Sequence, residues 1–108
     1  MPLRDEIADL LRMPENGAGA PTLDAIESTL TDGYAEALAL EAERSRIERR
    51  LGEVVRDAGE VSAHSVAAEL VELSERLDTA DGELARLRSL LRKLQGLRRR
   101  LRAGAPSA

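Results

Sequence analysis

Cysteine, tryptophan and phenylalanine are absent from the 108-residue sequence, and histidine and tyrosine occur once each. A chain without cysteine can form neither disulfide bonds nor thiolate metal sites. Because Tyr34 is the only aromatic residue, any core must be built from aliphatic side chains. These absences predict a protein without disulfides and without a bound metal or other cofactor.

Long apolar runs are also missing, since no stretch approaches the roughly 18 residues that a membrane-spanning helix needs. The first residues, MPLRDEIADLL, carry acidic side chains where a signal peptide has positive charge followed by an apolar block. We therefore expect a soluble, cytoplasmic protein.

Catalytic chemistry has little support among the residues present. General acid–base and nucleophilic mechanisms need several groups that converge in a pocket, and the chain offers one histidine and no cysteine. His64 is best interpreted as a solvated loop residue, and a single histidine cannot build a metal site alone. We predict that the protein is not an enzyme and has no small-molecule substrate.

The sequence is rich in Ala, Glu, Leu and Arg, and 33% of its residues are charged, a composition typical of coiled coils and long helices. Two apolar patterns run through it with alternating spacings of three and four residues, as at the seam of a left-handed coiled coil. The first comprises Leu23, Ile26, Leu30, Gly33, Ala37, Leu40, Arg44, Ile47, Leu51, Val54, Ala58 and Val61. The second comprises Val66, Leu70, Leu73, Leu77, Ala80, Leu84, Leu87, Leu91, Leu94, Arg98 and Leu101.

The segment DAGEVSAHS, residues 57–65, separates the two patterns and decides between one rod and a hairpin. Val61 and Val66 are five residues apart where seven are needed, so in a continuous helix the apolar stripes would lie on opposite faces. A turn is the better interpretation. Gly59 is predicted to end the first helix in a left-handed conformation, and Ser62 to cap the second. Val61 and Val66 are predicted to form a hydrophobic staple around that cap.

An antiparallel hairpin in which paired residue numbers sum to 124 matches eleven seam layers, from Ala58 with Val66 to Leu23 with Leu101. This register leaves the short loop 59–65. It also sets small residues against large ones: Gly33 faces Leu91, Ala37 faces Leu87, and Ala80 faces Arg44. The sequence therefore predicts an all-α fold, a long antiparallel coiled-coil hairpin with a short N-terminal helix.

Charge favours the same pairing. Residues 1–43 hold ten acidic and two basic side chains, and residues 84–108 hold eight basic and no acidic ones. The hairpin lays these segments side by side, with flanking pairs such as Glu27 with Arg102, Glu41 with Arg88, and Arg50 with Glu69. Each pair contributes only a few tenths of a kcal/mol at a surface, but together they favour the antiparallel arrangement.

Two arginines occupy seam positions. Arg44 is predicted to form a polar layer that fixes the register, its guanidinium reaching past Ala80 toward Glu41 or Glu48. Arg98 is predicted to extend into solvent.

Three segments follow from these patterns. Residues 1–21 are predicted to be a short amphipathic helix, with Leu3, Ile7, Leu10 and Leu11 at helical spacing, and a Pro/Gly linker. Residues 22–102 form the hairpin, and residues 103–108 are predicted to be a disordered tail.

Two surfaces at the base of the hairpin are candidate interaction sites. The first is a surplus of apolar residues beyond the seam, comprising Leu90, Leu97, Tyr34 and Leu38. Either the N-terminal helix or a second chain could cover it. The second is the basic face of residues 86–102, with Arg92, Lys93, Arg99, Arg100 and Arg102 outside the seam. Its charges could pair within the chain, bind phosphates of nucleic acid or lipid, or meet an acidic protein partner.

The sequence thus favours a non-enzymatic coiled-coil scaffold that self-associates, with a dimer expected, or docks on a helical protein. The alternative is a binder of nucleic acid or of an anionic membrane surface that uses the basic face.

Overall fold

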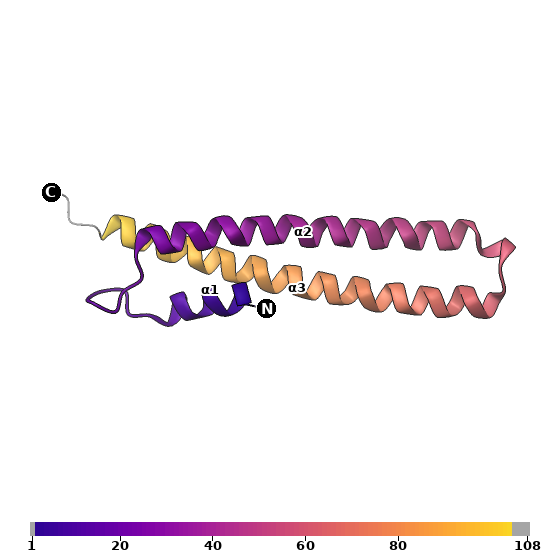
Figure 1. Ribbon diagram of the computed structural model, residues 1–108, viewed down its shortest axis with the longest axis horizontal. Helices are drawn as coiled ribbons and strands as arrows, with labels where there is room; N and C mark the ends of the chain where they lie inside the picture. The colour runs from indigo at the N-terminus through magenta and orange to yellow at the C-terminus, as the bar shows by residue number, and fades with distance from the viewer. Residues whose placement is uncertain (1, 105–108) are drawn as a thin grey trace. The chain divides into compact units, whose positions relative to one another are not determined.

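The computed structural model describes residues 2–104, and all regular structure in that range is helical (Figure 1). Helix α1 spans Pro2–Arg12, α2 spans Leu23–Arg56 and α3 spans Ala63–Ala103, with a short 3₁₀ helix, η1, at Ala58–Glu60. The predicted all-α class and the helical hairpin with a short N-terminal helix are confirmed. The predicted tail, 103–108, lies mostly outside the described residues, because Ala103 ends α3 and residues 105–108 are not described.

The chain forms two compact units, to which α2 and α3 both contribute. Unit 1 comprises Met1–Ala37 and Arg86–Ala108, and unit 2 comprises Leu38–Ala85. None of the helices between residues 2 and 104 has the length and apolar character needed to cross a bilayer.

The turn of the hairpin belongs to unit 2 and differs in one detail from the prediction. Ser62 caps α3 as expected, its Oγ accepting a hydrogen bond from the Ser65 amide at 3.2 Å. Gly59, however, lies in η1, and the only glycine with positive φ in the described residues is Gly17. The left-handed conformation predicted for Gly59 is therefore wrong, because the chain leaves α2 through a tightened 3₁₀ turn instead. Val61 stays 55% exposed, so the predicted staple contributes little burial.

The core of unit 2 is built from the predicted seam residues. Ile47, Val54, Leu73 and Ala80 are buried together, and the partly buried residues packed around them are Leu51, Val66, Leu70 and Leu77. These residues come from both heptad patterns. Partners in one layer, such as Ile47 with Leu77 and Leu51 with Leu73, have residue numbers that sum to 124. The predicted antiparallel seam is thereby confirmed in this unit.

Arg44 forms the polar layer of that seam. Its guanidinium donates hydrogen bonds to Glu48 on its own helix and to Asp81 on α3. The pairing with Glu48 was predicted, whereas Asp81 was not. Asp81 directly follows Ala80, the small residue that the register places opposite Arg44.

The seam of unit 1 is equally well buried. Its buried members are Ile26, Leu30, Ala37, Leu87, Leu91 and Leu94. Gly33 leaves space for Leu91, because a Cβ on Gly33 would overlap the Leu91 Cδ2 atom. Arg98 does not extend into solvent as predicted, since its Nε donates to Glu27 Oε1 at 3.2 Å.

Two flanks border the seam, and they differ in composition. We call the residues that directly follow the d positions of the heptad, such as Ile26 and Leu94, the e flank, and those that directly precede the a positions, such as Leu30 and Leu91, the g flank. The e flank holds the contacting pairs Glu27–Arg102 and Tyr34–Gln95, and the g flank holds Glu43–Arg76 and Arg50–Glu69. The pairs Glu27–Arg102 and Arg50–Glu69 were predicted and are confirmed. Glu41 and Arg88 each have an interaction partner as well.

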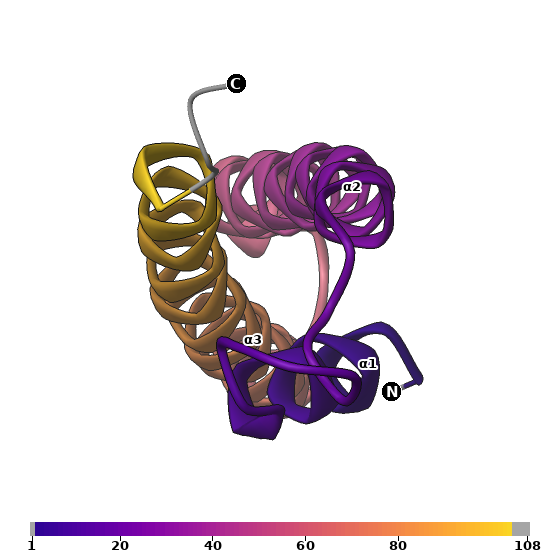
Figure 2. The same ribbon diagram turned by 90° about the vertical axis from the view of Figure 1, so that its left-hand side faces the viewer.

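Helix α1 packs on the g flank of unit 1. Ile7 is fully buried, Leu10 is 9% exposed, and Leu97 and Thr29 are buried on α3 and α2. In unit 1 the g flank carries Thr29, Leu90 and Leu97, whereas in unit 2 the same heptad positions carry charged side chains. On the g flank, an apolar helix face can therefore be buried in unit 1 but not in unit 2. Figure 2 looks onto this end of the chain and shows α1 beside the ends of α2 and α3.

The linker between α1 and α2 is ordered by turn residues. Helix α1 ends at Arg12, two residues before Pro14, and Gly17 adopts a φ of 92°, a conformation that glycine tolerates best. Thr22 then caps α2, its Oγ1 accepting a hydrogen bond from the Ala25 amide at 3.1 Å.

Candidate interaction surfaces

The apolar residues predicted as an interface are divided between different places. Leu97 is 2% exposed and Leu90 is half-buried, both on the g flank of unit 1 where α1 packs. Tyr34 lies on the e flank, where its hydroxyl accepts a hydrogen bond from Gln95 Nε2. Leu38 belongs to unit 2 and is 66% exposed. Of the two residues of this surplus on the g flank, Leu97 is buried where α1 of the same chain packs, whereas Leu90 is only half-buried.

The basic end of α3 is partly compensated within the chain. Arg98 and Arg102 both bind Glu27, with nitrogen–oxygen distances of 3.2 and 2.8 Å, and Arg100 binds Glu15 at 2.9 Å. These ion pairs lower the pKa of Glu27, chiefly through the hydrogen bond from Arg98. Internal charge pairing, one of the three predicted interpretations, is therefore observed for these three arginines.

The other predicted basic residues remain exposed. Arg92, Lys93 and Arg99 make no ion pair or side-chain hydrogen bond with any residue in the range 2–104. Arg92 and Lys93 lie in a groove whose other lining residues are Leu11, Ser89, Gly96 and Arg100. The sequence identified the basic residues of this groove, but not Leu11 or Gly96, because neither carries a polar signal.

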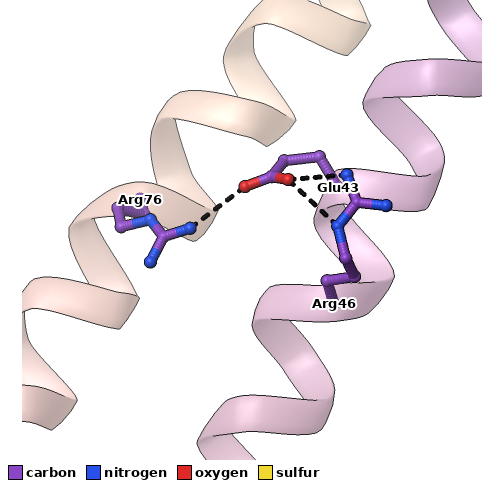
Figure 3. Close-up of polar contacts among 3 residues, drawn as sticks. All are labelled: Glu43, Arg46 and Arg76. Carbon is purple, nitrogen blue, oxygen red and sulfur yellow. Dashed lines mark hydrogen bonds and ion pairs between the residues drawn. The ribbon is translucent and has the colours of Figure 1, made fainter.

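A second groove lies on the g flank of unit 2. Its lining comprises Leu40, Glu43, Ile47, Glu72, Glu75, Arg76, Thr79, Ala80 and Glu83. Glu43 spans it, accepting hydrogen bonds from Arg46 on α2 at 2.8 Å and from Arg76 on α3 at 3.0 Å (Figure 3). Hydrogen bonds from Arg46 and Arg76 lower the pKa of Glu43. Since Ile47 and Ala80 are already buried, the charges of this groove act mainly to join the two helices.

Glu43→Gln is expected to lower the thermal unfolding midpoint at pH 7 and to lose that effect in acid. The folded-state pKa of Glu43 is lowered from the ordinary value of 4.5. Its stabilising effect is therefore complete above that value and is lost as the pH falls through the folded-state pKa. The measurement is the difference in midpoint between the variant and the wild type at pH 7 and at pH 3. Glu72→Gln, an exposed acid without a partner in the range 2–104, is the control. A difference that is unchanged between the two pH values would contradict the ion-pair interpretation.

Exposed apolar side chains gather on the other flank of unit 2, near the turn. Val55 is 62% exposed and Val71 is 59% exposed. The heptad register places both on the e-flank side, at the same level of the hairpin, together with Gly52, Ala67 and Ser74. We call these five residues the valine patch. The heptad pattern alone does not indicate this patch, because valines just outside a seam resemble ordinary variation in the repeat.

Residues 2–104 contain no group of three or more His, Asp or Glu side chains that could hold a metal ion.

Comparison with known proteins finds no matching family model, no similar curated protein and no similar solved structure.

Proposed function

We propose that this protein is a non-enzymatic interaction module that docks on a helix of a partner protein through the valine patch. The exposure of Val55 and Val71, about three-fifths of each side chain, carries the proposal. Both lie on one side of a hairpin whose remaining flank residues in this unit are mostly charged.

The fold of the chain itself gives no reason for valine at these positions. A β-branched residue has a lower helix propensity than the charged residues that usually occupy exposed helix sites. Neither side chain is needed for the seam, which is closed by Val54 and Leu73 beneath them. The small neighbour Ala67, which is exposed, leaves room for another helix to approach closely.

The size of the patch favours a partner over a second copy. Burying a valine fully is worth about 1.5–3 kcal/mol, so the two partly exposed valines offer roughly 2–4 kcal/mol per chain. Two copies would together gain roughly 4–8 kcal/mol, against an association cost of about 4–15 kcal/mol. Self-association through this patch is therefore weak. A partner helix with larger apolar side chains gains more from the same contact.

The test begins with a photo-crosslinking residue at position 71 in the native host, followed by purification of the protein captured there. Its affinity is then measured for the wild type, for Val55→Glu/Val71→Glu, and for Ala42→Glu/Thr79→Glu. The control places the same two charges on exposed positions of unit 2 outside the patch. We expect the valine variant to lose affinity by roughly tenfold or more, about 1.4 kcal/mol, and the control to lose less than about twofold. All three proteins should show the same thermal unfolding.

Equal affinities in the two double variants would contradict the proposal. A crosslink found only between copies of this chain would replace partner docking with self-association.

A further inference from the structure

The groove between α1 and α3 in unit 1 has the composition of an anion site. Its lining is Leu11 from α1 and Ser89, Arg92, Lys93, Gly96 and Arg100 from α3. Three of these side chains are cationic, one is a hydroxyl, and none is a carboxylate. The segment of α3 that forms it, residues 86–102, contains no acidic residue at all.

Two of the three cations are uncompensated. Arg92 and Lys93 are exposed, and neither makes an ion pair or side-chain hydrogen bond within the range 2–104. They are adjacent on α3, so their charges enter the groove from neighbouring positions. Adjacent like charges without a counterion repel one another, and a bound anion would relieve that repulsion.

Arg100 is held in position by an ion pair with Glu15, which leaves its terminal nitrogens available as donors. Its Nε donates to Glu15 Oε1 at 2.9 Å. Its Nη1 lies 3.4 Å from the place that a Cβ on Gly96 would occupy, so the guanidinium extends across that glycine. The Glu15 contact uses Nε, and the two terminal nitrogens remain as a fork of donors, the arrangement that matches phosphate oxygens.

We propose that this groove binds a compact, multiply charged phosphate group. Arg92 and Arg100 would each donate to two phosphate oxygens, and Lys93 would supply a point charge. The Ser89 hydroxyl would donate one further hydrogen bond. The chain has no aromatic side chain near the groove on which nucleobases could stack, and Tyr34, on the opposite flank, is the only aromatic residue. A compact phosphate therefore fits better than an extended single strand. The groove lies in unit 1 and the valine patch in unit 2, so the two proposals can fail independently.

Isothermal titration with inorganic tripolyphosphate at low salt is the test, using the full chain. Arg92→Gln/Lys93→Gln is expected to weaken binding by roughly tenfold or more. The matched control is Arg49→Gln/Arg56→Gln, which removes two charges from exposed arginines of unit 2 that have no partner in the range 2–104. The control should weaken binding less than about twofold, because charges that do not contact the ligand act only through screened long-range attraction.

Gly96→Leu separates binding from folding. Leucine has a higher helix propensity than glycine, and a Cβ at residue 96 would make an ordinary contact with Arg100 Nη1 at 3.4 Å, so the unfolding midpoint should rise. The longer side chain takes the space across which the Arg100 guanidinium lies, so tripolyphosphate affinity should fall by roughly threefold or more. A stabilised variant with reduced affinity cannot be explained by partial unfolding.

The source of the phosphate is distinguished by vesicles. Vesicles of phosphatidylcholine with and without a bisphosphorylated inositol lipid are sedimented with the protein, and tripolyphosphate is added as competitor. Competed binding to the phosphorylated vesicles supports the site with a lipid headgroup as its source. Tripolyphosphate binding without vesicle binding supports it with a free phosphate.

Absence of tripolyphosphate binding at low salt, or equal weakening in the two double variants, would overturn the proposal. Binding of duplex DNA without tripolyphosphate binding would overturn it in favour of an extended nucleic-acid surface.

Discussion

Gly33→Leu is expected to destabilise the protein by about 1–3 kcal/mol or more, measured by urea unfolding followed by circular dichroism. Leu91 packs so close to Gly33 that even a single added carbon would overlap its Cδ2 atom. Leu91 is itself 4% exposed and cannot move outward without opening the seam of unit 1. Overpacking of this kind forces strained rotamers or a backbone shift. Gly82→Leu is the control, because a Cβ on Gly82 would meet nothing within 4 Å, and it should be neutral or stabilising.

A double-mutant cycle tests whether the cost arises from this one contact. Leu91→Ala alone should cost about 2–5 kcal/mol, because it leaves a cavity in a buried layer. Gly33→Leu/Leu91→Ala returns a large side chain to the layer from the opposite helix. The double variant should therefore be more stable than the sum of the single effects by about 1–3 kcal/mol. Strictly additive effects would mean that residues 33 and 91 do not share a layer.

Ile7→Asp is expected to release α1 from unit 1 and to increase the mass of the protein in solution through additional self-association. Ile7 is fully buried, and an unpaired carboxylate cannot remain there at neutral pH. Release of α1 exposes Leu97 and the apolar part of the g flank, which another chain can then cover. Size-exclusion chromatography with light scattering measures the change in mass, and hydrogen exchange measures the loss of protection in α1. The loss of global stability is limited to the docking free energy of α1, since the helix can detach while the α2–α3 seam stays closed.

Met13→Asp provides the matched control for that experiment. It introduces the same side chain six residues away, at a position that is 39% exposed and lies outside α1. Its mass and its exchange protection should equal those of the wild type. An Ile7→Asp variant of unchanged mass that keeps α1 protected would show that the buried face of α1 does not hold it in place.

The seam could be predicted from the sequence because a heptad pattern fixes both which residues are buried and how two helices align. Ile47, Leu73 and Leu87 lie where the spacing placed them. The five-residue interval between Val61 and Val66 required a turn, since no helix can shift its apolar stripe by that amount. Gly33 facing Leu91 followed from the register alone.

Side-chain contacts outside the seam could not be predicted from the heptad pattern. Arg98 was expected in solvent, because nothing in a heptad pattern shows that Glu27 serves two arginines at once. The conformation of Gly59 depended on whether α2 would end in a left-handed or a 3₁₀ turn, and glycine permits both. The apolar surface of unit 1 could be covered by α1 or by a second chain, and a heptad pattern does not distinguish these two occupants. The valine patch and the role of Gly96 are defined by what lies next to them in space, which spacing does not show.

The polar layer at Arg44 has a consequence for the uniqueness of the hairpin. A heptad seam is nearly periodic, so sliding one helix by seven residues leaves most aliphatic layers intact and produces a competing arrangement of similar packing. In such a slid hairpin Arg44 would face Leu73 or Leu87 in place of Ala80. Its guanidinium would also lie about 10 Å along the axis from Asp81. The leucines alone would permit several registers of the two helices that differ by seven residues. One charged residue, Arg44, distinguishes among them, and a single register remains.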